Sequence, residues 1–540
     1  MNKILYGALG AFFISFPMQA KILVYPRIED KAVVDDGRYK VYVREAGTEN
    51  AWRELQVFSV EVDMDTRSRA AMAQFDADEP VEVKVVTPGQ MADNIKIRPL
   101  SQGISYNKVG EHALTFRLER PAKLSVEFGG DRMGNLHLFA NEVETETYDG
   151  TEGEGVVVWD GGSKDIFRKD CRLIYFGPGV HKPKDLPNGE IDVPSNCTVY
   201  LAPGALVKAK LRVDRAKNVR IVGRGMLFQP LRGVEITRSR NVHVEGITVV
   251  NPQHYTILGG ESRKVTVRNV KSFSSRGWSD GIDLMCCHDW LVDDVFLRTS
   301  DDCLAFYNHR WWFWGGTSNL TVQNSILWAD VAHAINVGGH GDDVPPKGET
   351  LRGVRFRNID VLNVDEDDDN YRGVMAVCAG DKNRVEDVSF EDIRDKWMVI
   401  GTASKRTSPF SPRPFGRRCV GEKGIGRFAV DKLGDKVNIV TKKEEDDRWL
   451  NVEIDWNSYF NEVSPDEREH IRLFTDIENK YDYLDRNEGS GVSGTKLIVS
   501  SVREFWSKDD ISRFYKEANK IVSPYTLLNP PFKIYITARE

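Results

Sequence analysis

The sequence predicts a mainly β protein built around a right-handed parallel β-helix, which an antiparallel β-sandwich precedes. Short apolar strands and polar turns recur roughly every 20 to 30 residues, the period of a solenoid. Asn-Val or Asn-Leu dipeptides mark equivalent turns at residues 218, 241, 269 and 319. Residues 21–149 instead show short alternating strands separated by turn residues, which is typical of a sandwich.

Length and composition set broad limits. At 540 residues the chain exceeds one ordinary core, so we expect about two to four domains. The formal net charge of −7 is small for this size and gives no support for a nucleic-acid partner. The seven cysteines include the neighbours Cys286 and Cys287, and we interpret most of them as small buried apolar residues. We predict no metal and no cofactor.

The N-terminus predicts export. A basic start at Lys3 is followed by an apolar run of about a dozen residues and then by the small residue Ala20. This order is typical of a secretory signal peptide, so we expect cleavage near Ala20 and a secreted or periplasmic protein. The apolar run is short for a membrane span, although an N-terminal anchor is the alternative. We expect no membrane partner.

The chain divides into four predicted segments: a signal peptide (1–20), the sandwich (21–150), the β-helix (151–395) and a C-terminal segment (396–540). In the sandwich, Trp52, Phe75 and Phe116 are interpreted as core residues. In the β-helix, asparagine suits the recurring turns because it tolerates left-handed backbone and can form side-chain ladders along the coils.

Three aspartates occupy positions one repeat apart. Asp280 is followed about twenty residues later by the adjacent pair Asp301 and Asp302. If one repeat is one coil, neighbouring coils lie about 4.8 Å apart and Asp280 lies beneath the pair. Like charges raise each other's pKa. Glycoside hydrolysis uses such a group, because one carboxyl must act as an acid while another stays ionised as a base.

Residues 21–394 resemble glycoside hydrolase family 28, the polygalacturonases. Residues 155–394 are similar to its pectinase-type β-helix, and the preceding sandwich is similar to the N-terminal domain that precedes such helices. Family 49, the dextranases, shares this fold and carboxylate arrangement. The family-28 motifs are Asn-Thr-Asp, Asp-Asp, Gly-His-Gly and Arg-Ile-Lys on successive coils. Here WSD, ending in Asp280, matches the first with Trp278 in place of Asn, and SDDCLAFY carries the second as Asp301 and Asp302. AHAINVG carries the third as His333, with alanines for the glycines.

The resemblance implies roles for these residues. Asp301 would be the general acid, and Asp280 and Asp302 would activate water on the opposite face, which gives inversion. That mechanism leaves a gap of about 6.5–9.5 Å between acid and base carboxyls. His333 could donate to the substrate or hold an aspartate in its ionised state.

The departures from the family pattern bear on the substrate. YRGVMAVC occupies the fourth motif's position, where Met375 and Val377 replace the basic pair. In polygalacturonases that pair holds the sugar carboxylate, a task to which arginine is suited as a bidentate donor. The loss of the pair, like the change from Asn to Trp278, argues against plain polygalacturonate and favours another polysaccharide.

The insertion NHRWWFWGGT follows Tyr307 and places aromatic residues on a loop near the carboxylates in sequence. Flat aromatic faces suit stacking against sugars, and the alternative is packing against the helix side. We predict these substrate-binding residues: Trp278, Tyr307, His309, Arg310, Trp311, Trp312 and Trp314. The acidic run DEDDDN at residues 365–370 is interpreted as a solvated loop, with a Ca²⁺ site as the alternative.

After residue 395 the repeat stops, and residues 396–540 resemble part of the GHKL ATPase superfamily of chaperone, gyrase and histidine-kinase-type proteins. The segment GEKGIGR matches its ATP-lid motif, and Thr495 matches its later Gly-Thr motif. Backbone N–H groups of such glycine loops can cradle phosphate. The resemblance implies a weak nucleotide site at Gly421, Lys423, Gly424, Gly426 and Thr495.

This second resemblance begins partway into its domain. The family's glutamate base, Mg²⁺-binding asparagine and adenine-binding aspartate have no counterparts upstream, so we expect no ATP hydrolysis. We interpret the region near Asp395 and Lys396 as a junction between two unrelated coding segments that truncates the β-helix.

The predicted function is therefore an exported, inverting glycoside hydrolase acting on a polysaccharide. One alternative is a truncated, non-catalytic carbohydrate-binding β-helix, and another is an ATP-binding protein that uses the C-terminal segment. A polysaccharide lyase on this fold would want Ca²⁺ ligands beside a basic residue, and the sequence shows no such grouping. The sequence indicates neither the glycosidic linkage nor the oligomeric state.

Overall fold

The structure is a computed structural model that describes residues 22–31, 33–151, 153–159, 170–182, 189–342, 348–366, 373–391, 434–442, 449–455, 480–484, 494–502, 507, 508, 510, 512 and 513. Nearly all of the described elements are β-strands. The chain forms two compact units, one of residues 1–307, 325–337 and 360–376, and one of residues 308–324, 338–359 and 377–540. The predicted signal peptide lies outside the described residues.

The first unit begins with two sheets that enclose a common core. One sheet has the order β1-β5-β11-β10-β7 with β4 beside β5, and the other has the order β3-β2-β6-β9-β8. Side chains from both sheets are buried in a single cluster. The bounds are β1 Ile22–Val24, β2 Lys40–Glu45, β3 Arg53–Leu55, β4 Phe58–Glu61, β5 Arg69–Ala77, β6 Val81–Val86, β7 Lys96–Arg98, the 3-10 helix η1 Leu100–Gln102, β8 Tyr106–Lys108, β9 Ala113–Leu118, β10 Ala122–Phe128 and β11 Asp131–Asn141.

This sandwich matches the prediction with two corrections. Strands β5 and β11 pair in parallel, so the sandwich is not purely antiparallel, because the chain passes through the second sheet before it returns beside β5. Phe75 and Phe116 are buried in the core as predicted. Trp52 is only half-buried, and its ring instead lies under the cationic groups of Arg44 and Lys84.

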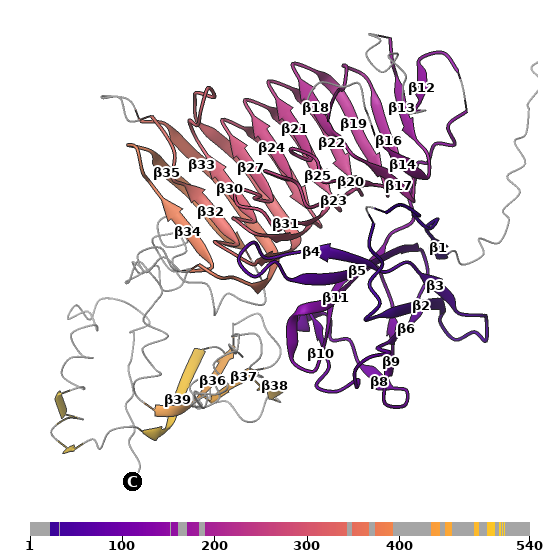
Figure 1. Cartoon of the computed structure of the whole chain (residues 1–540). Helices are drawn as coiled ribbons and strands as arrows, with labels where there is room; N and C mark the ends of the chain where they lie inside the picture. Colours follow the sequence, from indigo (N-terminus) through magenta and orange to yellow (C-terminus); the bar gives the residue numbers. More distant parts are fainter. Residues whose placement is uncertain are drawn as a thin grey trace, which may run out of the picture. The chain divides into compact units, whose positions relative to one another are not determined.

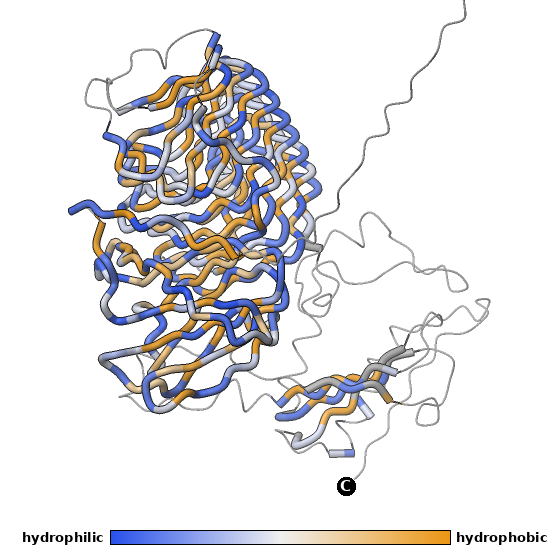
Figure 2. The backbone as a smooth tube through the Cα atoms, turned by 90° about the vertical axis from the view of Figure 1, so that its right-hand side faces the viewer, coloured by the Kyte–Doolittle hydropathy of each residue, from blue (hydrophilic) through white to orange (hydrophobic). Residues whose placement is uncertain are grey.

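The right-handed parallel β-helix follows, as predicted. Figure 1 shows its successive strands side by side, and Figure 2 shows apolar and polar positions alternating along the coils. Among the described residues, its larger sheet comprises β12 Val156–Val158, β13 Leu173–Phe176, β14 Gly179–His181, β16 Thr198–Leu201, β17 Ala205–Val207, β19 Lys217–Gly223, β20 Met226–Phe228, β22 Arg240–Glu245, β23 Thr248–Val250, β25 Arg263–Arg268, β26 Lys271–Phe273, β28 His288–Asp293, β29 Phe296–Thr299, β31 Thr317–Ala329, β33 Thr350–Asn363 and β35 Arg384–Glu391.

A second sheet of the β-helix carries the candidate site at one end of its strands. Its order is β15-β18-β21-β24-β27-β30-β32-β34. The bounds are β15 Glu190–Asp192, β18 Lys210–Asp214, β21 Val234–Thr237, β24 Ile257–Gly260, β27 Ile282–Met285, β30 Leu304–Tyr307, β32 Ile335–Gly338 and β34 Met375–Cys378. Each strand is only a few residues long, and the strands are paired in parallel. The turns that precede successive strands therefore lie next to one another along one edge of the sheet.

The register repeats from coil to coil. Val199, Ile221, Val244, Val267 and Val292 are paired in succession along the larger sheet. All five are buried, at 1% exposure or less. One apolar position in each coil thus fills the same place in the core, which is why the sequence period predicts the stacking.

The recurring asparagines have the predicted conformation. Asn218, Asn241, Asn269 and Asn319 all have positive φ, between 50° and 58°. The Asn241 amide donates to Asn218 at 2.7 Å, and the Asn218 amide donates to Asn196 at 2.8 Å. The predicted left-handed turns and the predicted side-chain ladder are both confirmed here.

Buried polar contacts join the sandwich to the β-helix. Arg224 Nε donates to Asp76 at 3.0 Å, and Arg298 Nη1 donates to Asn135 at 2.8 Å. Arg298 also pairs with Asp330 at 2.9 Å, with both side chains at 0% exposure. Because each buried charge here meets an opposite charge or a hydrogen-bond partner, the sandwich and the coils pack without isolated ions.

The described cysteines behave largely as predicted. Cys171, Cys197, Cys286, Cys287 and Cys303 are buried, and Cys378 is half-buried. No helix among the described residues is long and apolar enough to cross a membrane.

The second unit contains a separate sheet near the C-terminus. Its strands pair antiparallel in the order β38-β37-β36-β39, with bounds β36 Gly434–Lys442, β37 Trp449–Asp455, β38 Lys480–Leu484 and β39 Gly494–Val502. Gly421, Lys423, Gly424, Gly426 and the predicted junction at residues 395 and 396 lie outside the described residues. Thr495 lies in β39, paired with Thr441.

Candidate active site

Two neighbouring strands bring the three predicted aspartates together. Asp280 lies in the turn before β27, and Asp301 and Asp302 lie in the turn before β30. Ile282 of β27 pairs with Leu304 of β30, so Asp280 and Asp302 each stand two residues before paired positions. The Gly281 N–H also donates to the Asp302 carbonyl at 2.9 Å. The coil register therefore stacks the two turns.

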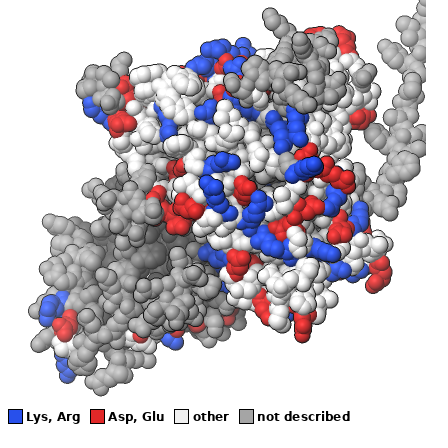
Figure 3. Space-filling view, in the orientation of Figure 1, with Lys and Arg blue, Asp and Glu red and all other residues white. Residues whose placement is uncertain are grey.

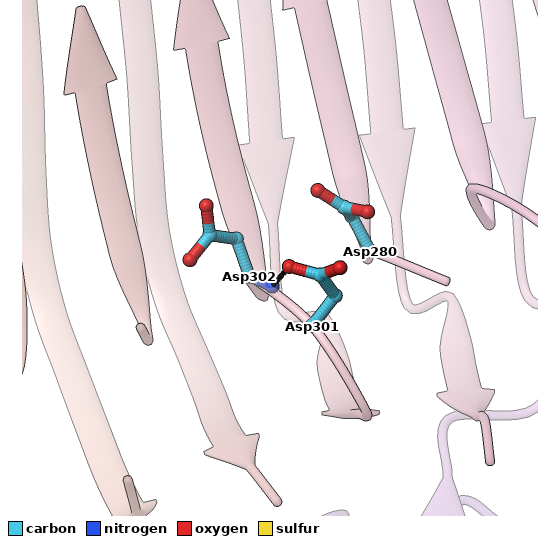
Figure 4. Close-up of side chains that lie close together, drawn as sticks. All are labelled: Asp280, Asp301 and Asp302. Atoms are coloured by element: carbon cyan, nitrogen blue, oxygen red, sulfur yellow. Dashed lines mark hydrogen bonds between the residues drawn. The ribbon is translucent and has the colours of Figure 1, made fainter. Parts of the chain in front are cut away.

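The carboxyl groups form a tight cluster. Oxygen atoms of Asp280, Asp301 and Asp302, one from each, all lie within 4.8 Å of one another. Figure 4 shows the Asp280 and Asp301 carboxyl groups side by side, while that of Asp302 lies on the other side of its backbone. This spacing is closer than the gap expected for a simple inverting pair, so the stereochemical outcome stays a prediction.

Asp301 is the most open of the three. It is half-buried, whereas Asp280 and Asp302 are each 5% exposed. Its Oδ1 accepts the Asp302 N–H at 3.0 Å, and its Oδ2 accepts the Trp278 N–H at 3.0 Å. These backbone donors hold the Asp301 carboxyl in place at the surface of the cluster.

Asp280 is the member of the cluster most affected by burial. Desolvation raises the pKa of Asp280 well above its ordinary value of 3.8, and the nearby carboxylates of Asp283, Asp301 and Asp302 raise it further. Both effects disfavour the charged carboxylate. The site can therefore hold a carboxylic acid proton on Asp280.

Asp302 is surrounded by hydrogen-bond donors. Its Oδ1 accepts the His333 backbone N–H at 2.9 Å and lies 3.2 Å from His333 Nδ1. Its Oδ2 accepts the Asn336 amide at 2.7 Å. This predicted histidine thus meets a carboxyl of the cluster. Asn336 was not predicted, although its place one coil beyond Asp302, in AHAINVG, was the available signal.

Glu366 is a second residue that the sequence interpretation missed. Its Oε2 lies 3.4 Å from His333 Nδ1. The sequence favours a solvated loop for the acidic run at residues 365–370, yet the Glu366 side chain is only 13% exposed. Residues 367–370 of that run lie outside the described residues.

Trp278 combines a strained backbone with an open side chain. Its φ is 58° and its exposure is 73%. A left-handed conformation is costly for a bulky residue, and such outliers concentrate at functional sites. Since the Trp278 N–H donates to Asp301, the backbone of this exposed residue lies next to the cluster.

The predicted aromatic loop lies in the second unit and forms stacked pairs. His309 stacks on Trp314 with ring centroids 3.5 Å apart, and Trp311 stacks on Trp312 at 5.8 Å. The Arg310 guanidinium lies over the Trp311 ring at 5.2 Å. Trp312 and Trp314 are 61% and 57% exposed. The loop therefore offers flat apolar faces to solvent.

Tyr307 differs from those aromatic residues. It lies at the end of β30, paired with Met285, and is only 4% exposed. Its ring offers little surface to a sugar, because its place within the strand puts it in the packed sheet. Sequence alone did not separate this residue from the loop that follows it.

Within the described residues, the three aspartates are the only group of His, Cys, Asp or Glu side chains close enough to surround a metal ion. Three neighbouring carboxylates are not by themselves an argument for a metal, because exposed and buried acidic groups also cluster for acid–base work. We interpret the cluster as an acid–base group.

Comparison with known proteins gives limited sequence matches. A polygalacturonase of Chamaecyparis obtusa is 27% identical over 112 residues, which is 20% of this chain and 20% of that protein. An exopolygalacturonase of Arabidopsis thaliana is 23% identical over 166 residues, 30% of this chain and 36% of that protein. The matched stretches thus span about a fifth and about a third of these relatives. No protein-family model matches.

Comparison with solved structures gives matches of low TM-score. Dex49A from Penicillium minioluteum matches with a TM-score of 0.42 and 15% identity, over 69% of this chain and 83% of that one. The family 28 exopolygalacturonase of Yersinia enterocolitica matches with a TM-score of 0.24 and 11% identity, over 62% and 98%. The chain is thus similar in sequence to polygalacturonases over part of its length.

Proposed function

We propose that this protein is a glycoside hydrolase that cleaves O-glycosidic bonds of a polysaccharide with its aspartate cluster. The observation that carries the proposal is the environment of the three carboxyls. One is buried so that its protonated form is favoured, one accepts three hydrogen bonds, and one is open to a substrate, all within 4.8 Å. Acid–base cleavage of a glycoside needs carboxyls in these different states.

The cluster can hold the attacking water. A water that donates to two carboxylate oxygens at ordinary hydrogen-bond lengths spans about 4.3 Å between them. That span is compatible with a cluster in which one oxygen of each carboxyl lies within 4.8 Å of the others. A water held in this way would be oriented and could lose a proton to a carboxylate as it attacks the anomeric carbon.

The roles implied by the family resemblance fit the exposure of the residues. Asp301, the most open carboxyl, would protonate the leaving oxygen, and the buried Asp280 and Asp302 would hold the water. The raised pKa of Asp280 makes it the natural store of the proton that the cluster shares in the free protein. The raised pKa of Asp280 also allows an alternative. In it, Asp280 itself protonates the leaving group.

The proposed substrate is a polysaccharide other than plain polygalacturonate. Met375 and Val377, which stand where the resembling family has a basic pair, are 45% and 52% exposed. They present apolar surface where a sugar carboxylate would need a cation. On the face shown in Figure 3, described basic and acidic side chains are interspersed rather than gathered into one positive field. Such a surface does not favour a polyanion.

Aromatic surfaces support a carbohydrate ligand. The exposed rings of Trp278, Trp312 and Trp314 could each stack on a sugar face. The same surfaces would serve a protein that binds a polysaccharide without cleaving it, which is the second candidate. We also propose export by the N-terminal segment, since a polysaccharide substrate lies outside the cell, and N-terminal sequencing of the exported protein tests this.

The test is hydrolysis of a panel of neutral and acidic polysaccharides, with new reducing ends as the readout, by the wild type and Asp301→Asn. Release by the wild type that the substitution abolishes is the expected result, and the responding polysaccharide identifies the substrate class. Binding of a polysaccharide by folded wild type without any release would favour the non-catalytic candidate instead.

A further inference from the structure

Glu366 is fixed next to the candidate site by its backbone. The Ala332 N–H donates to the Asp365 carbonyl at 2.7 Å, and these two residues form an isolated antiparallel bridge. Ala332 precedes His333 and Asp365 precedes Glu366. The bridge therefore brings the two segments together, and the side chains of His333 and Glu366 approach each other there, although the residues are more than thirty positions apart in the sequence.

Two carboxylates face one nitrogen of His333. Nδ1 lies 3.2 Å from Asp302 Oδ1 and 3.4 Å from Glu366 Oε2. The ring is 1% exposed. If Nδ1 had no proton, its lone pair would point at two oxygen acceptors in a site poor in water. A proton on Nδ1 turns both contacts into attractive ones, so the surroundings select the protonated Nδ1.

We propose that Glu366 is a positioning residue of the hydrolase site, which holds His333 with its proton on Nδ1 so that the imidazole donates to Asp302. This inference rests on the proposed function, in which Asp302 helps to activate the water. The titratable groups that the structure places against Nδ1 are Asp302, from the turn before β30, and Glu366, from the segment after β33.

The remaining contacts of Asp302 explain why the histidine matters. Besides His333, the Asn336 amide donates to its carboxyl. In the tautomer with the proton on Nε2, the Nδ1 lone pair would repel Asp302 Oδ1 and push the carboxyl from its place. A shift of about 1 Å in a reacting group can lower a rate by roughly 100-fold. Glu366 acts on Asp302 through His333.

The kinetic test compares Glu366→Ala and Glu366→Gln with the wild type on the responding polysaccharide. We expect Glu366→Ala to lower kcat by roughly 10-fold to 100-fold with KM nearly unchanged. Glutamine keeps a carbonyl acceptor for the Nδ1 proton, so Glu366→Gln should recover most of the rate. In a His333→Ala background the Glu366 substitutions should have no further effect. Equal losses in both backgrounds would overturn the proposal.

A second measurement does not depend on activity. Nitrogen-15 NMR of histidine-labelled protein reports which ring nitrogen carries the proton, and His333→Ala identifies the signal among the 10 histidines. We expect a protonated Nδ1 in the wild type and a shift towards protonated Nε2 in Glu366→Ala. If that shift occurs in a protein that cleaves nothing, the positioning stands and the hydrolase function fails. An unchanged Nδ1 proton in active Glu366→Ala contradicts the positioning itself.

Discussion

Two groups of buried aspartates in the same unit have neighbours of opposite charge. Asp76 and Asp330, between the sandwich and the β-helix, each have a guanidinium: Arg224 at 3.0 Å and Arg298 at 2.9 Å. Asp280 is nearly as buried, yet its charged neighbours are the carboxylates Asp283, Asp301 and Asp302. Burial raises the pKa of Asp330, but Arg298 opposes that rise. For Asp280 the neighbouring carboxylates of Asp283, Asp301 and Asp302 add to the effect of burial.

This difference in neighbouring charge distinguishes carboxylates that serve packing from carboxylates that we propose serve catalysis. A buried carboxylate that serves packing is stable only when a cation or hydrogen-bond donors balance it. A group of carboxylates that is left unbalanced lowers stability, and proteins keep such groups where activity needs them. The left-handed Trp278 beside the cluster is a second unfavourable feature at the same place. Both features lie at the edge of β27 and β30, where we propose the active site.

The largest expected effect breaks the cluster and separates its roles. Asp301→Asn should lower polysaccharide cleavage by roughly 100-fold to 10,000-fold, because general acid catalysis contributes about that factor. A glycosyl fluoride has a good leaving group that needs no acid, so its hydrolysis should fall far less. Asp302→Asn should lose both reactions. If instead only Asp280→Asn keeps hydrolysis of the glycosyl fluoride while it loses cleavage of the polysaccharide, Asp280 is the general acid.

A matched control for these variants is Asp289→Asn. Asp289 is exposed in the same coil as Asp280 and has a φ of 58°, which asparagine tolerates well. Its rates should equal those of the wild type. A comparable loss in this control would mean that the Asn variants act through the coil and not through the cluster.

Asp330, which is paired with Arg298, should matter for stability. Asp330→Ala leaves the Arg298 charge buried, so we expect the free energy of unfolding to fall by about 3–5 kcal/mol. Denaturant unfolding followed by fluorescence measures it. Glu119→Gln, which breaks the exposed pair with Arg117, should change stability by about 1 kcal/mol or less. Similar effects of the two substitutions would remove the contrast on which the comparison depends.

The pH dependence of stability sharpens the contrast further. Because the folded-state pKa of Asp280 is raised, the native protein holds a proton there that the unfolded chain releases as the pH rises above about 3.8. The wild type should therefore lose stability relative to Asp280→Asn from that pH upwards, with a slope of at most about 1.4 kcal/mol per pH unit. The loss ends above the folded pKa. Parallel stability curves for the two proteins would show that the carboxyl is not perturbed.

The smallest expected effect concerns Trp278. Trp278→Asn places at a φ of 58° a residue that adopts it readily, so stability should rise by about 1 kcal/mol. Loss of the indole face should raise KM by a few-fold, since an aromatic stacking contact is worth about 1 kcal/mol. Thermal unfolding and KM on the responding polysaccharide measure the two effects. A fall in stability would mean that the indole packs as a structural residue.

The fold was predictable from the sequence because its repeats carry a regular signal. The buried ladder from Val199 to Val292 and the left-handed asparagines at 218 and 241 follow from the period and from asparagine's backbone preference. The stacking of Asp280 on Asp302 follows from the same register. The parallel pairing of β5 with β11 was not predictable, since alternation along a strand does not reveal the direction of its partner.

The contact between Glu366 and His333 and the burial of Tyr307 could not be predicted from the sequence, for a physical reason. Glu366 and His333 meet through a bridge outside the regular coil, and no period relates their positions. The burial of Tyr307 likewise depends on where β30 ends. The catalytic and binding roles of the predicted residues stay predictions, because they depend on a substrate as well as on the geometry of the chain.

The most direct test of the comparison is one variant with two readouts at neutral pH. Asp280→Asn should abolish polysaccharide cleavage and, in the same sample, raise the free energy of unfolding, because the amide needs no proton and bears no charge. A variant that is inactive and more stable would show that the Asp280 carboxyl is kept for chemistry. A variant that is less stable than the wild type, or that still cleaves, would contradict the account.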